Sequence, residues 1–275
     1  MKPQLAETPG AKDCFYSSTL LWLLGRNILG REMSILVVCG SSPDKEVLHD
    51  LGFKNVTISN LDVRLKGVEF DPYQWSYQDA ERLTFQDAAF DFCVAHNGLH
   101  HCYSPHRALL EMYRVARSGI LVFEPRDSVV ARIGIRLNFG QEFEVHAVAA
   151  NELAFGGVKN TSMPNFVYRW TEREVEKTIR SFAPWGRHRF IYRYALRIPW
   201  GRLTMMKNKG LLVLVRAFLP ALRFFFALFP KQANGFAFVV LKPRVPLDLH
   251  PWMRFDGTSL ALNEEWIRAR YGQLK

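Results

Sequence analysis

The stretch that decides the fold opens with Asp79-Ala80-Glu81-Arg82-Leu83-Thr84-Phe85, continues through Phe90-Asp91-Phe92-Cys93-Val94-Ala95 and Asn97-Gly98-Leu99-His100-His101, and closes with Gly119-Ile120-Leu121-Val122-Phe123-Glu124-Pro125. Between the last two segments, apolar residues recur at helical spacing at Leu109, Leu110, Met112, Tyr113 and Val115. A strand, an amphipathic helix and a second strand in this order form a βαβ unit of a doubly wound sheet. Ligands of such sheets bind at the carboxyl ends of the strands, which here are residues 97–101 and 124–126. We therefore expect the chain before this stretch to complete a pocket and the chain after it to cover that pocket.

Length and composition favour one folded domain. The chain has 275 residues, of which 48% are hydrophobic and 13% aromatic, so a disordered protein is excluded. Its four cysteines show no paired spacing, and no basic segment leads into an apolar signal sequence at the start. We therefore expect a single domain over residues 1–275 in a cytoplasmic protein. The net charge of +10 favours an anionic partner, which can be a nucleic acid, an anionic substrate or a lipid surface.

Two more strands are predicted upstream. Residues 34–38 form an apolar, β-branched strand that leads into the small-residue turn Cys39-Gly40-Ser41 and a helix start. Residues 56–62 form the next strand and place Asp62 at its carboxyl end, about twenty residues after the turn. A carboxylate at this position can accept hydrogen bonds from both hydroxyls of a ribose. The alternative is a surface Asp that only ends a strand.

In this order the segments resemble the class I S-adenosylmethionine-dependent methyltransferases, in particular the small-molecule branch with a Leu-His-His segment after the fourth strand. Four pieces match: residues 35–42, Asp62, the pair Asp79-Ala80 ahead of Leu83 and Phe85, and residues 90–101 up to Glu124. The resemblance covers residues 34–126. It implies an α/β fold with a doubly wound, Rossmann-like, seven-stranded mixed sheet whose last strand is antiparallel. It also implies methyl transfer from S-adenosylmethionine, for which we expect a small-molecule, lipid-linked or glycan acceptor.

The resemblance implies two groups of site residues. The cofactor-binding group comprises Cys39, Gly40, Ser41, Asp62, Asp79, Ala80 and Asn97. Within it, Asp62 would bind the ribose, Asp79 and Ala80 the adenine, and the others the amino-acid part. His101 and His96 are candidate catalytic bases near the methyl group, because an imidazole titrates near neutral pH. The alternative for each histidine is a hydrogen bond to the backbone at a strand end.

The loop after the first strand departs from the family pattern. Val37 stands where the family usually has an acid, and the loop contains fewer glycines. Because glycine allows close approach of a ligand to the backbone, a non-catalytic interaction or assembly protein that retains the fold is the alternative function. A nicotinamide-binding Rossmann domain is disfavoured, since residues 38–45 lack the Gly-x-Gly-x-x-Gly turn that holds a pyrophosphate.

Potential metal ligands cluster around the Leu-His-His segment, at Cys93, His96, His100, His101, Cys102 and His106. Histidine and cysteine at short separations can bind zinc. These spacings match no standard zinc pattern, and Cys93 lies inside a predicted strand. We therefore predict no metal site.

The chain after residue 126 is expected to cover the pocket and complete the sheet. Residues 127–170 form a cap insertion, with a helix over residues 142–155. Its candidate acceptor contacts are Asn151, Glu152, Asn160, Asn165, Tyr168, Arg169 and Trp170. Residues 171–242 form the C-terminal half of the sheet, beginning with a helix that has a capping box at Thr171 and Glu174. Residues 243–275 form a tail draped on the body.

A long apolar run, Leu211 to Phe229, leaves two alternatives open. Arg216, Pro220 and Arg223 interrupt it, so crossing a bilayer would be costly. Buried between the last two strands, it would leave a freely soluble enzyme. With Lys207, Lys209 and Lys231 nearby, the run also suits an interfacial helix at the inner face of an anionic membrane, with a lipid-linked acceptor. Nucleic acid is not an expected partner, because the basic residues are scattered.

Overall fold

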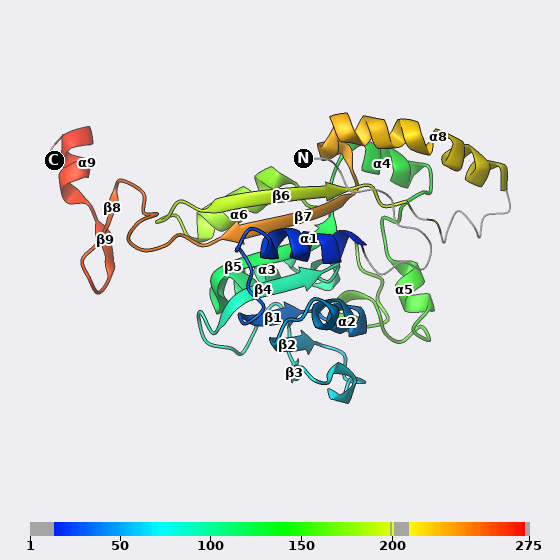
Figure 1. The fold of residues 1–275 in the computed structure, drawn as a ribbon, viewed down its shortest axis with the longest axis horizontal. Coiled ribbons are helices and arrows are strands. Elements are labelled where there is room, and N and C mark those ends of the chain that lie inside the picture. Colours follow the sequence, from blue (N-terminus) through cyan, green and yellow to red (C-terminus); the bar gives the residue numbers. More distant parts are fainter. Residues whose placement is uncertain (1–13, 199, 201–208, 273–275) are drawn as a thin grey trace.

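A computed structural model describes residues 14–198, 200 and 209–272, and its centre is one seven-stranded sheet (Figure 1). The strands are β1 (Ser34–Val38), β2 (Asn55–Asn60), β3 (Gln74–Tyr77), β4 (Phe90–His96), β5 (Ala116–Pro125), β6 (Arg189–Ala195) and β7 (Gly235–Leu241). Their order across the sheet is β3-β2-β1-β4-β5-β7-β6. The first five pair in parallel, whereas β7 pairs antiparallel with β5 and β6. The predicted doubly wound mixed sheet with an antiparallel last strand is therefore confirmed.

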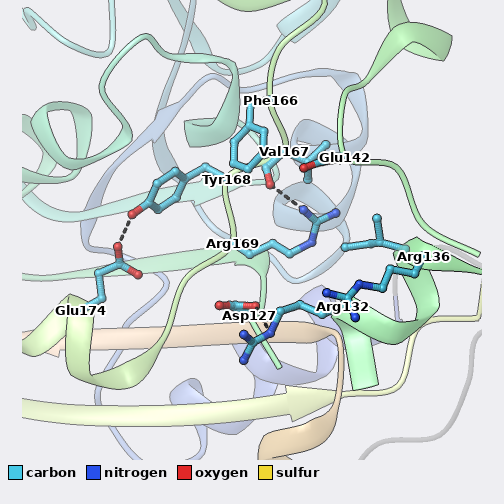
Figure 2. A pocket seen from close by; sticks show the side chains of 10 residues that line it. Asp127, Arg132, Arg136, Glu142, Phe166, Val167, Tyr168, Arg169 and Glu174 are labelled. Carbon is cyan, nitrogen blue, oxygen red and sulfur yellow. Dashed lines mark hydrogen bonds and ion pairs between the residues drawn. The ribbon is translucent and has the colours of Figure 1, made fainter. Parts of the chain in front are cut away.

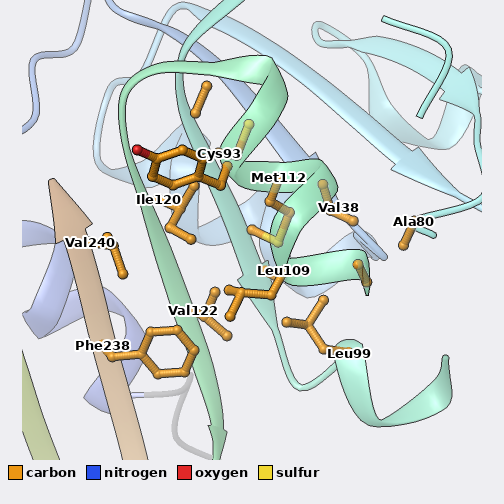
Figure 3. Close-up of a cluster of buried hydrophobic side chains, with 14 of the residues drawn as sticks. Val38, Ala80, Cys93, Leu99, Leu109, Met112, Ile120, Val122, Phe238 and Val240 are labelled. Atoms are coloured by element: carbon orange, nitrogen blue, oxygen red, sulfur yellow. The ribbon is translucent and has the colours of Figure 1, made fainter. Parts of the chain in front are cut away.

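Helices cover both faces of this sheet. α1 (Cys14–Leu24) and α2 (Ser42–Asp50) contribute to the core on one face, and α3 (Pro105–Val115) and α6 (Glu172–Phe182) to the core on the other. Figure 3 shows the second core, in which Leu109 and Met112 of α3 lie beside Ile120 and Val122 of β5. Because the central strands are buried on both faces, they read in the sequence as continuous apolar runs.

Side chains cap the first turns of α6 and α2, and the predicted capping box at Thr171 and Glu174 is confirmed. Thr171 accepts a hydrogen bond from the backbone N–H of Glu174, and the Glu174 side chain accepts one from the backbone of Thr171. At α2, the Asp44 carboxylate accepts the backbone N–H and the hydroxyl of Ser41, both at 2.8 Å. Each bond satisfies a donor that the helix itself leaves unpaired. The helices that flank the carboxyl edge of the sheet therefore begin at fixed points.

The insertion after β5 contains α4 (Val129–Arg136), α5 (Val145–Ala149) and the 3-10 helix η3 (Val158–Asn160). The expected helix over residues 142–155 is wrong except for α5. Glu152 and Leu153 adopt φ values of 57° and 59°, and Gly156 has φ 90°, so the chain turns out of helical geometry. Other short 3-10 helices are η1 (Val68–Phe70), η2 (Leu99–His101) and η4 (Pro230–Gln232).

The apolar run near residue 220 forms α8 (Lys209–Leu228), which lies beside α4 at the carboxyl edge of the sheet (Figure 1). Burial between the last two strands is wrong for most of this helix: Phe226 is buried, whereas Phe218 and Phe224 are 57% and 66% exposed. Apolar residues surround the helix, and only one side of it can face the protein. Among the described residues, no helix combines the length and apolar content needed to cross a membrane.

The C-terminal segment folds separately from the sheet. Gly186 and Leu249 form a β-bridge at the body, and the chain then forms the hairpin β8 (Met253–Phe255) and β9 (Leu260–Leu262), followed by α9 (Glu264–Tyr271). Figure 1 shows this segment projecting from the end of the sheet opposite α4, α5 and α8. The expectation of a tail draped on the body is therefore wrong beyond about residue 250.

Candidate active site

A cavity of about 260 Å³ lies at the carboxyl ends of β1, β2 and β4, and we call it the donor cavity. It is lined by Cys39, Ser41, Asn60, Leu61, Asp62, Gln78, Asp79, Ala80, His96, Asn97, Gly98, His101, Cys102, Gly156, Gly157, Lys159 and Asn160. The structure thus brings together every residue predicted to bind the cofactor except Gly40, and both candidate bases. Gly40 lies beneath the cavity floor, where a Cβ atom would come within 2.6 Å of Ile58 Cγ2.

The loop after β1 keeps glycine-like geometry despite its few glycines. Cys39 adopts φ 55° and Asn97, after β4, adopts φ 52°, both in the left-handed region that costs a residue with a side chain about 1–2 kcal/mol. A Cβ atom on Gly98 would lie 2.4 Å from Cys39 Cβ, so the two loops are in contact. Val37 is fully buried in the core beneath α1 and α2. Its replacement of an acid therefore puts no side chain into the cavity.

Gly98→Ala is expected to separate these two loops. A methyl group at 2.4 Å from Cys39 Cβ cannot be accommodated without a backbone shift, and overpacking of this kind typically costs about 1–3 kcal/mol. We expect a lower urea midpoint and weaker ligand binding in the donor cavity, measured by denaturation and calorimetry. Gly30→Ala is the matched control, because a Cβ atom on Gly30 would only make an ordinary contact with Met33 at 3.6 Å and its φ is not positive. Unchanged stability in Gly98→Ala would contradict the loop contact.

The carboxylate of Asp62 lies just beyond β2 and is held by Arg64. The Arg64 guanidinium donates from Nε to Asp62 Oδ1 at 2.9 Å and from a terminal nitrogen to Oδ2 at 2.6 Å. These hydrogen bonds hold the pKa of Asp62 below its ordinary value, so the carboxylate is ionised. Arg64 is largely exposed, and ion pairs at exposed positions contribute only about 0–1 kcal/mol. A ligand with two hydroxyl donors can therefore replace Arg64 at little cost.

The carboxylate of Asp79 is held by a cation from the insertion. Lys159 Nζ lies 2.7 Å from Asp79 Oδ2 and 3.1 Å from Glu81 Oε2. Burial raises the pKa of Asp79, but the hydrogen bond and charge of Lys159 outweigh this effect and lower it. Sequence reasoning missed Lys159 and Arg64, because no local pattern shows that residue 159 folds back 80 positions onto the acid. The insertion therefore covers the donor cavity, as predicted.

The two candidate bases differ in their surroundings. His96 stacks on Tyr16 with ring centroids 4.5 Å apart, and its nitrogens face Asn97 at 3.1 Å and Asp44 at 3.6 Å. His101 is more exposed, and its Nε2 lies 3.4 Å from Glu144 Oε2. Burial and the charge of His100 lower the pKa of His101. The insertion thus supplies a carboxylate to the Leu-His-His segment, which the sequence did not reveal.

His100 is buried between two carboxylates. Its Nδ1 lies 2.5 Å from Glu124 Oε2, and its Nε2 lies 3.4 Å from Glu144 Oε2. Burial disfavours its charge, but the two carboxylates outweigh burial and raise the pKa of His100 to about 10. Glu124 Oε1 also accepts the backbone N–H of Leu99 at 2.7 Å. Glu124 therefore ties the end of β5 to the loop after β4.

Two larger cavities lie on either side of α4. A polar cavity of about 490 Å³ contains three arginines and three acids, namely Arg132, Arg136, Arg169, Asp127, Glu142 and Glu174 (Figure 2). An apolar cavity of about 510 Å³ lies between α4 and α8, with Val130, Leu137, Val215, Leu222 and Phe226 in its lining. Ile135 and Arg169 border both cavities. Of the expected acceptor contacts, Tyr168 and Arg169 line the polar cavity, whereas Trp170 is fully buried in the core.

Comparison with known proteins identifies the domain. A family model described as a methyltransferase domain matches residues 37–123. No curated protein matches the sequence significantly.

Solved structures resemble this chain at low identity. YcgJ from Bacillus subtilis has 13% identity and a TM-score of 0.48 over 84% of this chain and 99% of that chain. The [4+2]-cyclase SpnF has 14% identity and a TM-score of 0.50 over 88% of each chain. Magnesium protoporphyrin IX methyltransferase from Synechocystis, solved with bound SAH, has 10% identity and a TM-score of 0.46 over 83% of this chain and 82% of that chain. At these identities the likeness concerns the fold alone.

Proposed function

We propose that this chain, whose residues 37–123 match a methyltransferase-domain model, transfers the methyl group of S-adenosylmethionine to a lipid-linked acceptor at a membrane surface. The cofactor supplies a methyl group already activated on a sulfonium. The protein therefore has to align this group with the acceptor and exclude water from the site. Two surfaces carry the proposal: the donor cavity and the exposed apolar face of α8.

The donor set of the cavity fits the cofactor. Ionised Asp62 offers two acceptor oxygens for the ribose hydroxyls, and Asp79 offers one for the adenine amino group. The backbone of Ala80 would contact the adenine ring, and Cys39, Ser41 and Asn97 the amino-acid part. A non-catalytic assembly protein predicts a pocket filled by side chains. A cavity that both acids border argues against that alternative.

The acceptor is proposed to have an apolar part and a polar part. Arg197, which lines the apolar cavity, donates to Oδ1 of Asn97, which lines the donor cavity, at 3.3 Å. The polar cavity lies on the other side of α4 and presents planar charged groups beside Phe166 and Tyr168 (Figure 2). An aliphatic chain suits the first cavity, and a glycan or phosphorylated head group suits the second.

The exposed face of α8 supports a membrane as the source of this acceptor. Its exposed apolar side chains recur every three or four residues and so share one face; they are Val213, Leu214, Ala217, Phe218, Ala221, Phe224, Phe225 and Leu228. No charged residue lies among them. The opposite side of the helix lines the apolar cavity through Val215, Leu222 and Phe226. A helix that inserts its exposed face into lipid would therefore keep the apolar cavity on its protein-facing side, close to the membrane.

Basic residues accompany this face. Arg216 and Lys231 are exposed, and Arg223 is half-buried on the same side of α8 as Arg216. Each basic residue near an anionic surface adds about 1 kcal/mol of attraction. Lys207 lies outside the described residues, as does the side chain of Lys209. The charge pattern therefore favours an anionic membrane, on its cytoplasmic side if the protein is cytoplasmic.

Co-sedimentation with anionic vesicles tests the membrane proposal. We expect wild-type protein to pellet with the vesicles at low salt and to be released by salt. Phe218→Ser with Phe224→Ser should weaken binding at least tenfold, because each exposed phenylalanine contributes about 1.5–3 kcal/mol when buried in lipid. Leu247→Ser with Leu262→Ser is the matched control, since these exposed residues lie outside α8. Recovery of the wild type wholly in the supernatant would contradict the proposal.

A further inference from the structure

Three side chains with metal-binding atoms converge between the donor cavity and the insertion. His100 and His101 come from η2, and Glu144 precedes α5. The Nε2 atoms of both histidines lie 3.4 Å from Glu144 Oε2, and all three atoms lie within 4.8 Å of one another. The histidines are adjacent in sequence, whereas the glutamate is brought to them by the fold of the insertion.

The histidine and cysteine spacing alone predicts no metal site, but the fold adds Glu144, and we propose that His100, His101 and Glu144 bind a first-row divalent metal ion, with zinc as the reference ion. Two ligands that each lie about 2.0–2.1 Å from a tetrahedral zinc are separated by about 3.3–3.4 Å. The two histidine–carboxylate separations match this value. Two histidines and one carboxylate, with a fourth position open, form a ligand set that binds zinc in enzymes.

The groups around the ligands are those that a metal site requires. A metal-bound histidine usually donates its second N–H to a carboxylate, which fixes the tautomer and orients the ring. Glu124 Oε2 lies 2.5 Å from His100 Nδ1, and Glu124 is itself fixed by the Leu99 N–H. This leaves Nε2 of His100, the atom nearest Glu144, to bind the ion.

A buried asparagine also contacts the cluster. Asn165 is 2% exposed, and its Nδ2 lies 3.3 Å from Glu144 Oε2. Its Oδ1 is buried and has no hydrogen-bond partner among the described residues. An unpaired buried oxygen costs about 1–3 kcal/mol, so a bound water within reach of Oδ1 would stabilise this side chain.

The metal would lie next to the donor cavity, since His101 lines that cavity and Glu144 is partly exposed. If the proposed function holds, an acceptor oxygen in the open position would be polarised by the ion. His101 would then act as a metal ligand and not as a base. Metal binding itself requires neither cofactor nor acceptor, so it can be measured separately.

Calorimetric titration of the full chain with zinc chloride, after chelator treatment and removal of any affinity tag, tests the site. We expect one strong site per chain. Glu144→Gln and His101→Asn should abolish strong binding, and Glu124→Gln should weaken it about 10- to 100-fold. His106→Asn is the matched control, because His106 also lies 3.3 Å from a glutamate, Glu174, but outside the cluster. Cobalt substitution should give a tetrahedral absorption spectrum in the wild type and in His106→Asn, but not in Glu144→Gln or His101→Asn.

Absence of zinc binding by the folded wild type would overturn the proposal. Equal binding by wild type, Glu144→Gln and His101→Asn would also overturn it, because the zinc would then be held elsewhere. Glutamine has the shape of glutamate, so Glu144→Gln should keep its fold, which circular dichroism checks. Zinc binding and methyl transfer are measured independently. A protein that binds no zinc can still transfer methyl groups, and a protein that transfers no methyl group can still bind zinc.

Discussion

Asp62→Ala is expected to weaken the binding of S-adenosylhomocysteine and S-adenosylmethionine by about 10- to 150-fold. A hydrogen bond to a charged group contributes about 1.5–3 kcal/mol, and the variant removes the ionised acceptor for both ribose hydroxyls. Calorimetry with either ligand measures the change. Because Arg64 is largely exposed, its loss of a partner should alter stability little.

Asp87→Ala is the matched control for this effect. Asp87 is strongly exposed, pairs with Arg114 and lies outside the donor cavity, so its replacement should leave ligand affinity unchanged. An Asp62→Ala variant that is folded and binds the cofactor as tightly as the wild type would show that the ribose lies elsewhere.

Glu124→Ala is expected to cause the largest loss of stability, about 3–5 kcal/mol. The Glu124 side chain is fully buried, and its removal leaves the N–H of Leu99 without its partner and the buried charge of His100 with only the more distant Glu144. Urea unfolding in the presence of a chelator measures the change in the free energy of unfolding without any contribution from bound metal.

Two further variants serve as comparisons for Glu124→Ala. Glu124→Gln should cost less, because its amide oxygen can still accept the Leu99 N–H. Glu32→Ala, which removes an exposed partner of Lys54, should change stability little. A small effect of Glu124→Ala would mean that the link between β5 and the loop after β4 contributes nothing substantial.

The central sheet was predictable because most of its strands have a recognisable sequence pattern. β1, β4, β5 and β7 are buried, so each appears in the sequence as an uninterrupted apolar run. The sequence did not predict β3, because its four residues are partly exposed and contain no apolar run. Asp62 and Asp79 were placed at the cavity because the carboxyl ends of parallel strands meet at one edge of the sheet. The pattern of strands in the sequence is sufficient to locate that edge.

The groups that surround these acids were not predictable. Lys159 and Glu144 reach the site through the path of the insertion, and that path depends on turns at left-handed residues such as Glu152 and Leu153. No local pattern in the sequence marks Lys159 or Glu144 as a site residue, because lysine and glutamate are common in surface loops. The location of α8 was not predictable either. Apolar residues surround most of this helix, so its sequence does not indicate which side faces the protein.

Methyl transfer from labelled S-adenosylmethionine to fractionated cell extract tests the central claim most directly. The extract is separated into a lipid fraction and an aqueous fraction, and each is incubated with wild-type protein and with Asp62→Ala. We predict label in the lipid fraction with the wild type and a strong loss of that label with Asp62→Ala. Label confined to the aqueous fraction would contradict the lipid-linked acceptor, and no incorporation in either fraction by a protein that binds the cofactor would contradict the proposed methyl transfer.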